Sequence, residues 1–217
     1  MIRLENINKF YHTRRGARQI LNSVNLSIEH GDKIGILGRN GAGKSTLIRI
    51  ISGAEQPSDG RVHRGMSASW PIAYTGAFQS ALTGIDNLRF ICRIYGVDPK
   101  SRIDFVQQFS DLGEYLYEPI NTYSAGMRAR LGFAVSMSIE FDCFLIDEVV
   151  SVGDSRFHEK CRVELFEKRA DRALVIVSHD AGYIREHCTR AAVLVQGQLH
   201  NFDEIDQAFE FYESSMR

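Results

Sequence analysis

The residues with the most evident chemistry form the run GRNGAGKST at positions 38–46. The run fits the phosphate-loop pattern G-x-x-x-x-G-K-[ST], in which glycines let backbone N–H groups point inward around an anion. Lys44 can reach the β- and γ-phosphates of a nucleotide, and the Ser45 hydroxyl can ligate Mg²⁺. We therefore expect a nucleoside triphosphate to bind at Gly38, Arg39, Asn40, Gly41, Ala42, Gly43, Lys44, Ser45 and Thr46.

The elements on either side of this loop are the ones that such a site needs. Residues 34–37 (IGIL) are a short apolar run typical of a buried strand, and residues 47–51 (LIRII) are predicted to continue as a helix that ends at Gly53. A helix N-terminus presents free N–H groups and partial positive charge, so it adds to the attraction for phosphate. A glycine-rich turn with a chance lysine would not account for this strand–loop–helix order.

A second chemical feature is the pair Asp147-Glu148, which follows the apolar run 141–146. Ligands gather at the carboxyl ends of strands in parallel α/β sheets. Asp147 suits the shell of a Mg²⁺ ion, directly or through water, and Glu148 suits a general base that orients or deprotonates the attacking water. An apolar strand that ends in carboxylates can also be purely structural. The position of this pair about 100 residues after a phosphate loop favours the catalytic interpretation.

Four shorter stretches are weak alone but occur in a definite order around the phosphate loop. They are Gln79, residues 122–128 (TYSAGMR) before a predicted helix, residues 151–154 (SVGD), and His179 within the run SHD. A lone histidine after a strand is more often a core or surface residue than a functional one. Their combined order, rather than any single member, indicates a functional set.

The first part of the chain is predicted to be β-structure that leads into the phosphate loop. Apolar and polar residues alternate within residues 1–33. Residues 14–18 (RRGAR) are expected to form a hairpin loop, for which a phosphate contact and a plain surface turn both remain open, with the surface turn favoured. A turn at 58–60 and a short strand at 66–70 are expected to follow.

The rest of the chain changes from helical to alternating patterns. Residues 85–95 and 103–112 have apolar residues at helical spacing, and strand character returns at 143–146, 173–177 and 191–195. Strands that alternate with helices predict a mainly parallel sheet. Further helices are predicted at 157–170 and 183–187. An aromatic-rich end with Phe202, Phe209, Phe211 and Tyr212 fits a helix that packs on the core, and a surface for a partner remains the less favoured alternative.

The composition limits the class of function. The chain has 217 residues, with 26 Lys plus Arg, 27 Asp plus Glu and a formal net charge of −1, which gives no support for electrostatic binding to nucleic acid. Four cysteines without a C-x-x-C pair favour a reducing compartment. Charges near the N-terminus do not fit a secretory signal, and no apolar run approaches the roughly 18 residues of a membrane span. We therefore expect any membrane role to depend on a partner.

Together, these stretches resemble the ATP-binding cassette (ABC) ATPases, and the resemblance covers essentially the whole chain. Residues 38–46 resemble the Walker A loop, and residues 144–148 resemble the Walker B strand with its catalytic glutamate. Residues 124–127 stand at the place of the signature motif, and residues 151–154 resemble the D-loop. Tyr11 stands where the family stacks an aromatic ring on adenine, although an ordinary strand-end aromatic remains an alternative.

The resemblance implies an ATP hydrolase with ATP and Mg²⁺ as cofactors. Gln79 matches the Q-loop glutamine and His179 the switch histidine. The implied catalytic residues are Lys44, Gln79, Glu148 and His179. The implied metal-site residues are Ser45, Gln79 and Asp147.

The resemblance also implies a fold and a domain organisation. The fold is α/β, with a P-loop NTPase core built on a mainly parallel sheet, an N-terminal antiparallel β-subdomain and an inserted helical subdomain. Residues 1–217 then form a single nucleotide-binding domain. Residues 1–75 and 141–217 make up the ATP-binding core with the β-subdomain, and residues 76–140 make up the helical subdomain.

In the family, two cassettes pair head to tail, and the signature residues of one subunit cap the ATP held by the other. The resemblance therefore implies a homodimer in which Ser124, Ala125 and Gly126 contact the partner's nucleotide. N–H groups at the start of the following helix suit a γ-phosphate. Met127 stands in place of the usual glutamine and cannot donate that glutamine's hydrogen bonds, and Ala125 stands in place of a glycine.

The departures from the usual motifs resemble one subgroup. The runs YSAGMRARLGF at 123–133, IDEV at 146–149 and VGD at 152–154 resemble polysaccharide exporters, and SWP at 69–71 with GAFQSALTG at 76–84 resembles the ATP-binding subunits of group 2 capsular polysaccharide exporters of Gram-negative bacteria. We expect no C-terminal carbohydrate-binding domain, since the chain stops at Arg217. O-antigen or teichoic-acid type exporters are the alternative within this subgroup.

This resemblance implies partners and a location. The partners are transmembrane permease subunits, and through them periplasmic and outer-membrane capsule export proteins, with a lipid-linked polysaccharide as the transported substrate. The chain is then expected at the cytoplasmic face of the inner membrane as a peripheral subunit. The junction around Gln79 is expected to receive a cytoplasmic helix of the permease, with apolar area offered by Trp70, Phe78, Leu82 and Tyr95, unless these residues only pack the core.

Three other classes of function remain as alternatives. A soluble ABC ATPase that acts on ribosomes or DNA is disfavoured, since such proteins usually have two cassettes, a coiled-coil insertion or a basic face. A P-loop kinase of small molecules would leave residues 124–127 and His179 unexplained. A structural zinc site is conceivable because His158 and Cys161 are three residues apart on a predicted helix, with His187 and Cys188 elsewhere.

Overall fold

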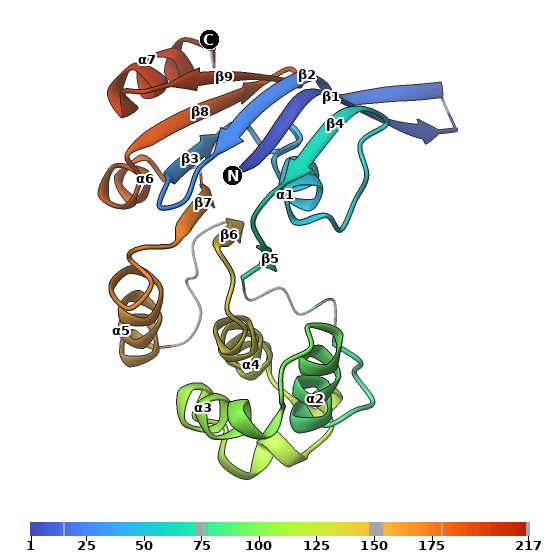
Figure 1. The fold of residues 1–217 in the computed structure, drawn as a ribbon, viewed down its shortest axis with the longest axis vertical. Coiled ribbons are helices and arrows are strands. Elements are labelled where there is room, and N and C mark those ends of the chain that lie inside the picture. The colour runs from blue at the N-terminus through green and yellow to red at the C-terminus, as the bar shows by residue number, and fades with distance from the viewer. Residues whose placement is uncertain (15, 73–75, 77, 148–153, 179, 216–217) are drawn as a thin grey trace. The chain divides into compact units, whose positions relative to one another are not determined.

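The computed structural model describes residues 1–14, 16–72, 76, 78–147, 154–178 and 180–215 (Figure 1). The chain divides into two compact units. The first comprises residues 1–71, 141–149 and 171–217, and the second comprises residues 72–140 and 150–170. The phosphate loop belongs to the first unit, and the segment predicted to be a helical subdomain belongs to the second.

The first unit begins with a three-stranded antiparallel sheet in the order β2-β1-β4. Its strands are β1 (Ile2–Thr13), β2 (Gly16–Ile28) and β4 (Asp59–Arg64). The turn expected at 58–60 is therefore wrong beyond its first residue. Gly60 has a φ of 95° and lies where the pairing of β4 with β1 shifts register, and a Cβ there would approach the Asn6 carbonyl oxygen to 2.5 Å. This glycine marks an irregularity within a strand instead of a turn between strands.

A six-stranded sheet in the order β5-β6-β7-β3-β8-β9 forms the rest of this unit's framework. The first five strands in that order are parallel and β9 is antiparallel to β8, which confirms the mainly parallel sheet. Strands β3, β6 and β7 are almost entirely buried apolar runs, as expected for a parallel sheet. The strands are β3 (Lys33–Leu37), β5 (Ala68–Pro71), β6 (Cys143–Asp147), β7 (Ala173–Val177), β8 (Arg190–Val195) and β9 (Gln198–Phe202).

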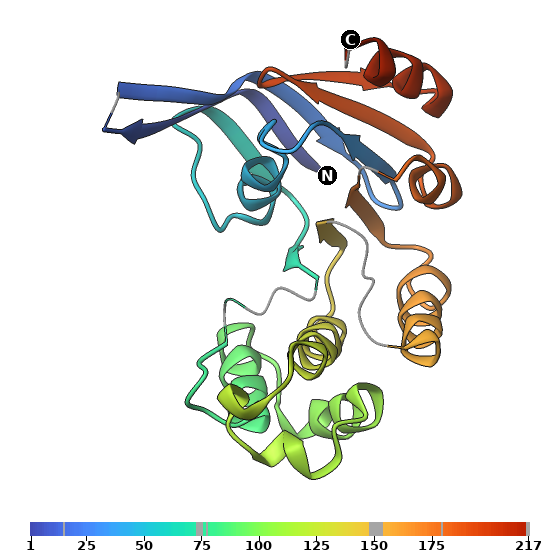
Figure 2. The same ribbon diagram turned by 180° about the vertical axis from the view of Figure 1, so that it is seen from behind.

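The described helices of the first unit are α1 (Lys44–Ser52), α6 (Ala181–His187) and α7 (Ile205–Ser215). Helix α1 ends at Gly53, whose φ of 84° is the left-handed conformation of a C-cap, as the sequence predicted. Helix α7 lies along β8 and β9 in both views (Figures 1 and 2). The ring of Phe211 is 5.4 Å from that of Phe202, and Phe209 is buried. The aromatic C-terminal segment therefore packs on the core.

The second unit is helical, and its described elements are α2 (Gly84–Ile94), α3 (Lys100–Ser110), the 3₁₀ turns η1 (Gly113–Tyr117) and η2 (Ile120–Thr122), α4 (Ala125–Ser138) and α5 (Ser155–Arg162). Rings from three of these helices meet in its interior. Phe109 of α3 stacks on Phe133 of α4 at 5.6 Å, and Phe157 of α5 contacts Phe109 edge-on at 5.7 Å. Residues of α5 thus pack with the helices that precede the sheet strand β6.

The end of α5 departs from the plain helix predicted for residues 157–170. Residues Val163–Glu167 form a π-helical turn, η3, in which the Lys168 N–H donates to the Val163 carbonyl oxygen at 3.0 Å, five residues earlier. Apolar periodicity does not distinguish a π turn from an α-helix, so the sequence contains no clear signal for it. Single π turns of this kind are inserted in α-helices and need support from their surroundings.

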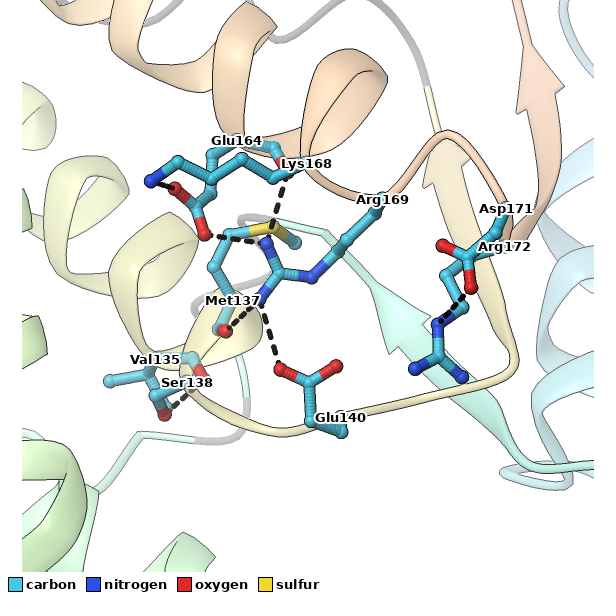
Figure 3. A network of polar contacts seen from close by, with 9 residues as sticks. All are labelled: Val135, Met137, Ser138, Glu140, Glu164, Lys168, Arg169, Asp171 and Arg172. Carbon is cyan, nitrogen blue, oxygen red and sulfur yellow. Dashed lines mark hydrogen bonds and ion pairs between the residues drawn. The ribbon is translucent and has the colours of Figure 1, made fainter.

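A buried charged pair follows from this turn (Figure 3). The Arg169 guanidinium donates to the Glu164 carboxylate at 2.6 Å and to the carbonyl oxygens of Glu164 at 3.0 Å and Met137 at 2.8 Å. A longer contact of 3.3 Å joins Arg169 to Glu140, and Lys168 binds the other Glu164 oxygen at 2.8 Å. Arg169 therefore ties the π turn to the C-terminal end of α4.

Candidate active site

The phosphate loop lies between β3 and α1, as the sequence predicted. Gly41 and Gly43 have φ values of 82° and 110°, which favour glycine, and a Cβ at Gly43 would lie 3.0 Å from the Ile20 side chain. The Lys44 ammonium donates to the carbonyl oxygens of Gly38 at 2.7 Å and Arg39 at 3.0 Å. The loop therefore curls around its own lysine, whose ammonium is held by two loop carbonyl oxygens.

A pocket of about 600 Å³ opens beside this loop, within the size range of small-ligand sites. It is lined by Tyr11, Arg18, Ile20, Asn40, Gly41, Gly43, Lys44, Ser45, Thr46 and Asp147. The structure therefore brings the two distant candidates, Tyr11 and Asp147, together with the phosphate loop. Arg18, expected within a hairpin loop, belongs to β2, pairs directly with Tyr11 of β1 and lines the same pocket.

Asp147 and Ser45 provide a suitable pair of ligands for a magnesium ion. Asp147 is the last residue of β6, next to Val177 of β7, and Ser45 lies in the first turn of α1. Both line the pocket, and a carboxylate with a hydroxyl are the oxygen donors that Mg²⁺ takes beside nucleotide phosphates. These residues fit the implied cofactor.

Tyr11 is held by a network of polar side chains that the sequence did not indicate. Its hydroxyl donates to Glu55 at 2.6 Å and accepts from Arg49 at 3.1 Å, and Glu55 also binds Lys9 at 2.8 Å and the Arg49 Nε at 2.9 Å. Burial by itself would raise the pKa of the Glu55 carboxyl, but hydrogen bonds from Lys9, Tyr11 and Arg49 outweigh it and lower the pKa to about 2. Glu55 therefore stays ionised at any physiological pH.

The predicted signature residues lie in the second unit, at the start of α4. Ser124 is the N-cap of this helix, and its hydroxyl oxygen accepts from the Met127 N–H at 3.2 Å. A hydroxyl has one hydrogen and two lone pairs, so this cap leaves its hydrogen able to donate. Ala125 and Gly126 form the first turn, where N–H groups have no partner within the helix.

Gln79 also lies in the second unit, in a turn organised by a residue that sequence reasoning missed. The Asn87 side chain accepts from the Gln79 N–H at 2.8 Å and donates to the carbonyl oxygens of Gln79 at 3.1 Å and Thr83 at 2.9 Å. Asn87 is buried while the Gln79 side chain is exposed. An asparagine on the buried face of an amphipathic helix was the available signal.

The apolar residues expected near Gln79 differ in their exposure and surroundings. Leu82 and Tyr95 are among the most exposed large apolar side chains described, with Phe90 and Ile94 of α2. Phe78 is partly buried. Trp70 lies in the first unit and packs edge-on against Phe141 at 5.4 Å, in line with the core-packing alternative.

Several predicted site residues lie outside the described residues: Glu148, residues 151–153 and His179. Asp154, the last residue of the predicted D-loop, is described. It caps α5 by accepting from the Phe157 N–H at 2.9 Å and pairs with Arg130 of α4 at 3.0 Å. The Phe157 N–H and Arg130 hold the pKa of the Asp154 carboxyl below its usual value.

The zinc alternative finds no support in the part of the chain that the structure describes. No three His, Cys, Asp or Glu side chains there form a group that could hold a metal ion. His158 is exposed and Cys161 is buried, so the two residues point to different surroundings. Burial raises the pKa of the Cys161 thiol to about 12, which disfavours the thiolate that zinc requires.

The fold and the pocket define a nucleotide-hydrolysing cassette. A model of the ABC transporter family matches residues 21–151, and the chain belongs to this family as an ABC-type ATP hydrolase.

Three relatives are similar to this chain over almost its whole length. The chain is 55% identical over 217 residues to the ATP-binding protein BexA of Haemophilus influenzae, with 100% of both chains covered. It is 56% identical over 214 residues to the capsule polysaccharide export ATP-binding protein CtrD of Neisseria meningitidis serogroup B, with 99% of both chains covered. It is 40% identical over 206 residues to the polysialic acid transport ATP-binding protein KpsT of Escherichia coli, with 94% of this chain and 92% of that protein covered.

Solved structures agree on the fold. A structure described as the ATP-binding subunit of an ABC transporter has a TM-score of 0.83 at 20% identity and covers 100% of both chains. A dimeric ATP-binding cassette in a post-hydrolysis state with ADP and Pi has a TM-score of 0.78 at 21% identity, with 93% of this chain and 98% of that chain covered. Within the described part of the chain, none of the helices has the length and apolar character that crossing a membrane requires.

Proposed function

We propose that this chain is the ATP-hydrolysing subunit that powers export of a capsular polysaccharide through a separate membrane permease. The observation that carries the proposal is the 56% identity, over 99% of both chains, to a protein named for capsule polysaccharide export. The pocket that joins Tyr11, the phosphate loop and Asp147 supports the ATP-hydrolysing part of it.

In this proposal, Tyr11 stacks on the adenine, and the loop N–H groups with Lys44 hold the phosphates. Magnesium, when bound through Ser45 and Asp147, neutralises charge on the β- and γ-phosphates. Glu148 orients water for attack on the γ-phosphorus and takes its proton, while the bond between this phosphorus and the bridging oxygen of ADP breaks. Gln79 and His179 contact the γ-phosphate side and its attacking water.

We also propose that two copies pair head to tail. Ser124, Ala125 and Gly126 of one copy then cap the nucleotide of the other. The N-cap geometry of Ser124 supports this role, because its hydroxyl hydrogen and the first N–H groups of α4 are suited to a phosphate oxygen. Closure then depends on the γ-phosphate, and hydrolysis releases it.

The proposed location is the cytoplasmic face of the inner membrane, where the chain binds permease subunits as a peripheral protein. Leu82, whose N–H donates to the Gln79 carbonyl oxygen, and Tyr95 at the C-terminal end of α2 are exposed and offer apolar area to a helix of the permease. Through the permease, periplasmic and outer-membrane export proteins complete the path of a lipid-linked polysaccharide.

The test is complementation in a strain that lacks this gene, with surface capsule and ATPase activity of the purified permease complex as readouts. Wild type is expected to restore both. Glu148→Gln is expected to bind ATP, to form an ATP-dependent dimer and to hydrolyse about 10²–10⁴-fold more slowly, as loss of a positioned base does. The matched control is Glu210→Gln, the same chemical change at an exposed residue of α7.

Each of three outcomes would contradict a different part of the proposal. Near-normal turnover by Glu148→Gln removes that residue from the base role. If the strain that lacks the gene has a normal capsule but loses O-antigen or a teichoic-acid type polymer, the exported polysaccharide is that polymer. If the chain purified from membranes brings no permease with it, the transport role is contradicted altogether.

A further inference from the structure

The side chains behind the pocket wall form a compact network of Lys9, Tyr11, Arg49 and Glu55, here called the Tyr11 network. Glu55 lies at its centre and binds the other three through contacts of 2.6 to 2.9 Å. Lys9 and Tyr11 come from β1, Arg49 comes from α1, and Glu55 follows that helix. The network therefore joins the antiparallel sheet to the helix that begins at the phosphate loop.

One guanidinium in this network connects the two ends of the nucleotide pocket. An Arg49 terminal nitrogen donates to the Tyr11 hydroxyl at 3.1 Å and lies 3.3 Å from the Thr46 hydroxyl. Tyr11 and Thr46 both line the pocket. The spacing between the aromatic wall and the phosphate loop thus depends on Arg49, and Glu55 holds Arg49 in place through its Nε.

The same network restricts the ring of Tyr11. Its hydroxyl is bonded to both Glu55 and Arg49, and the Lys9 ammonium lies 5.3 Å from the ring centroid, over one face. A base that stacks on Tyr11 therefore takes the opposite face. Bonds at the hydroxyl and a cation over one face leave the ring little rotational freedom, so less entropy is lost when a base stacks on it.

We propose that Glu55 is a positioning residue for base recognition: it holds Tyr11 and Arg49 so that the ring stays at the distance from the phosphate loop that a purine nucleotide spans. The inference rests on the proposed nucleotide site, in which Tyr11 is the stacking platform. Glu55 itself contacts Tyr11, Lys9 and Arg49, and it acts through Tyr11. A residue in this role affects ligands that contain a base and spares ligands that consist of phosphate alone.

The experiment compares ADP with inorganic tripolyphosphate, measured by competition against a fluorescent ADP analogue. Base stacking on an aromatic side chain is worth about 1–3 kcal/mol, or roughly 5- to 150-fold in affinity. Tyr11→Ala is expected to lose this whole factor for ADP and none for tripolyphosphate. Glu55→Ala is expected to weaken ADP binding by about tenfold with tripolyphosphate affinity unchanged, and Glu55→Gln, which keeps an acceptor oxygen, is expected to fall between Glu55→Ala and wild type.

The matched control is Glu5→Ala. It removes a carboxylate from β1, the strand of Lys9 and Tyr11, and this carboxylate pairs with Arg3 and His63 outside the pocket. It is expected to leave both affinities unchanged. Equal loss of ADP and tripolyphosphate affinity in Glu55→Gln would mean that Glu55 only supports the fold, and unchanged ADP affinity in both Glu55 variants would remove it from base recognition. Unchanged ADP affinity in Tyr11→Ala would instead overturn the stacking role on which the inference rests.

Discussion

Removal of the buried guanidinium of Arg169 should destabilise the helical unit more than removal of any exposed arginine in it. The Arg169 and Glu164 side chains are only 8% and 7% exposed. Arg169→Ala leaves the Glu164 carboxylate buried with one remaining cation, Lys168, and deprives the Met137 and Glu164 carbonyl oxygens of their donor. The buried carboxylate then has one cation in place of two, and two buried carbonyl oxygens each lose a hydrogen bond.

The magnitude follows from these contacts. Breaking a buried ion pair by removal of one partner costs about 3–5 kcal/mol. Because Lys168 stays bound to Glu164, we expect the lower part of this range, about 3–4 kcal/mol. For a chain of this size, 1 kcal/mol shifts Tm by about 2–4 °C, so Arg169→Ala should lower Tm by about 6–16 °C.

The assay is thermal and urea unfolding, followed by far-UV circular dichroism and by the fluorescence of Trp70. The dichroism reports mainly on helices, and Trp70 lies in the other unit. If Arg169→Ala lowers the unfolding midpoint measured by dichroism more than the midpoint measured by Trp70 fluorescence, the loss of stability lies in the helical unit. Arg162→Ala is the matched control, because Arg162 makes exposed ion pairs with Glu159 and Glu167 that solvent screens.

Two results would refute this reasoning. The first is an Arg169→Ala midpoint no lower than that of Arg162→Ala. The second concerns the double variant Glu164→Leu/Arg169→Met, which removes both charges and should recover much of the loss, since apolar replacement of a buried pair is often neutral. A double variant less stable than Arg169→Ala would show that the pair's charge is not the source of the penalty.

Three further predictions concern nucleotide capping, coupling and pH. Ser124→Arg should keep ATP binding, measured with a fluorescent analogue, and lose phosphate release; loss of binding by the folded monomer would contradict the head-to-tail arrangement. Gln79→Ala should keep ATP binding and only part of the basal hydrolysis and should lose capsule export in cells, and full export would show that coupling runs elsewhere. The depressed pKa of Glu55 stabilises the fold fully above about pH 4.5 and progressively less as pH falls toward 2. Glu55→Gln should therefore reduce the dependence of the unfolding midpoint on pH between pH 5 and 3. A pH profile equal to that of the wild type would contradict the lowered pKa of Glu55.

Features that depend on local spacing could be predicted from the sequence. The phosphate loop, the strand before it and Asp147 follow from short motifs and apolar runs, because a strand–loop–helix unit is specified by neighbouring residues. The parallel sheet follows from alternation of strands and helices. The strand order β5-β6-β7-β3-β8-β9 could not be derived, since it depends on pairings between segments far apart in the chain.

Residues whose roles depend on distant partners were missed. Glu55 meets Tyr11 across 44 positions, and nothing near Glu55 distinguishes it from a solvated turn residue. The charged neighbours of Arg18 predict a loop, yet strand pairing sets Arg18 opposite Tyr11. Gly60 predicts a turn because glycine is common in turns, and only the pairing with β1 identifies it as a strand irregularity.

The π turn after α5 sets a rule for deletions in this segment. In an α-helix, residues five apart are separated by about 140° around the axis, since each residue turns the chain by about 100°. Glu164 and Arg169 are five apart, so an unbroken α-helix would place them on different faces, whereas the wider turn brings their charged groups to 2.6 Å. A relative that lacked one residue between Glu164 and Arg169 would regain a regular helix, in which the acid and the arginine would be four apart and would still lie on the same face. The loss of one residue from this segment during evolution is therefore expected to preserve the ion pair.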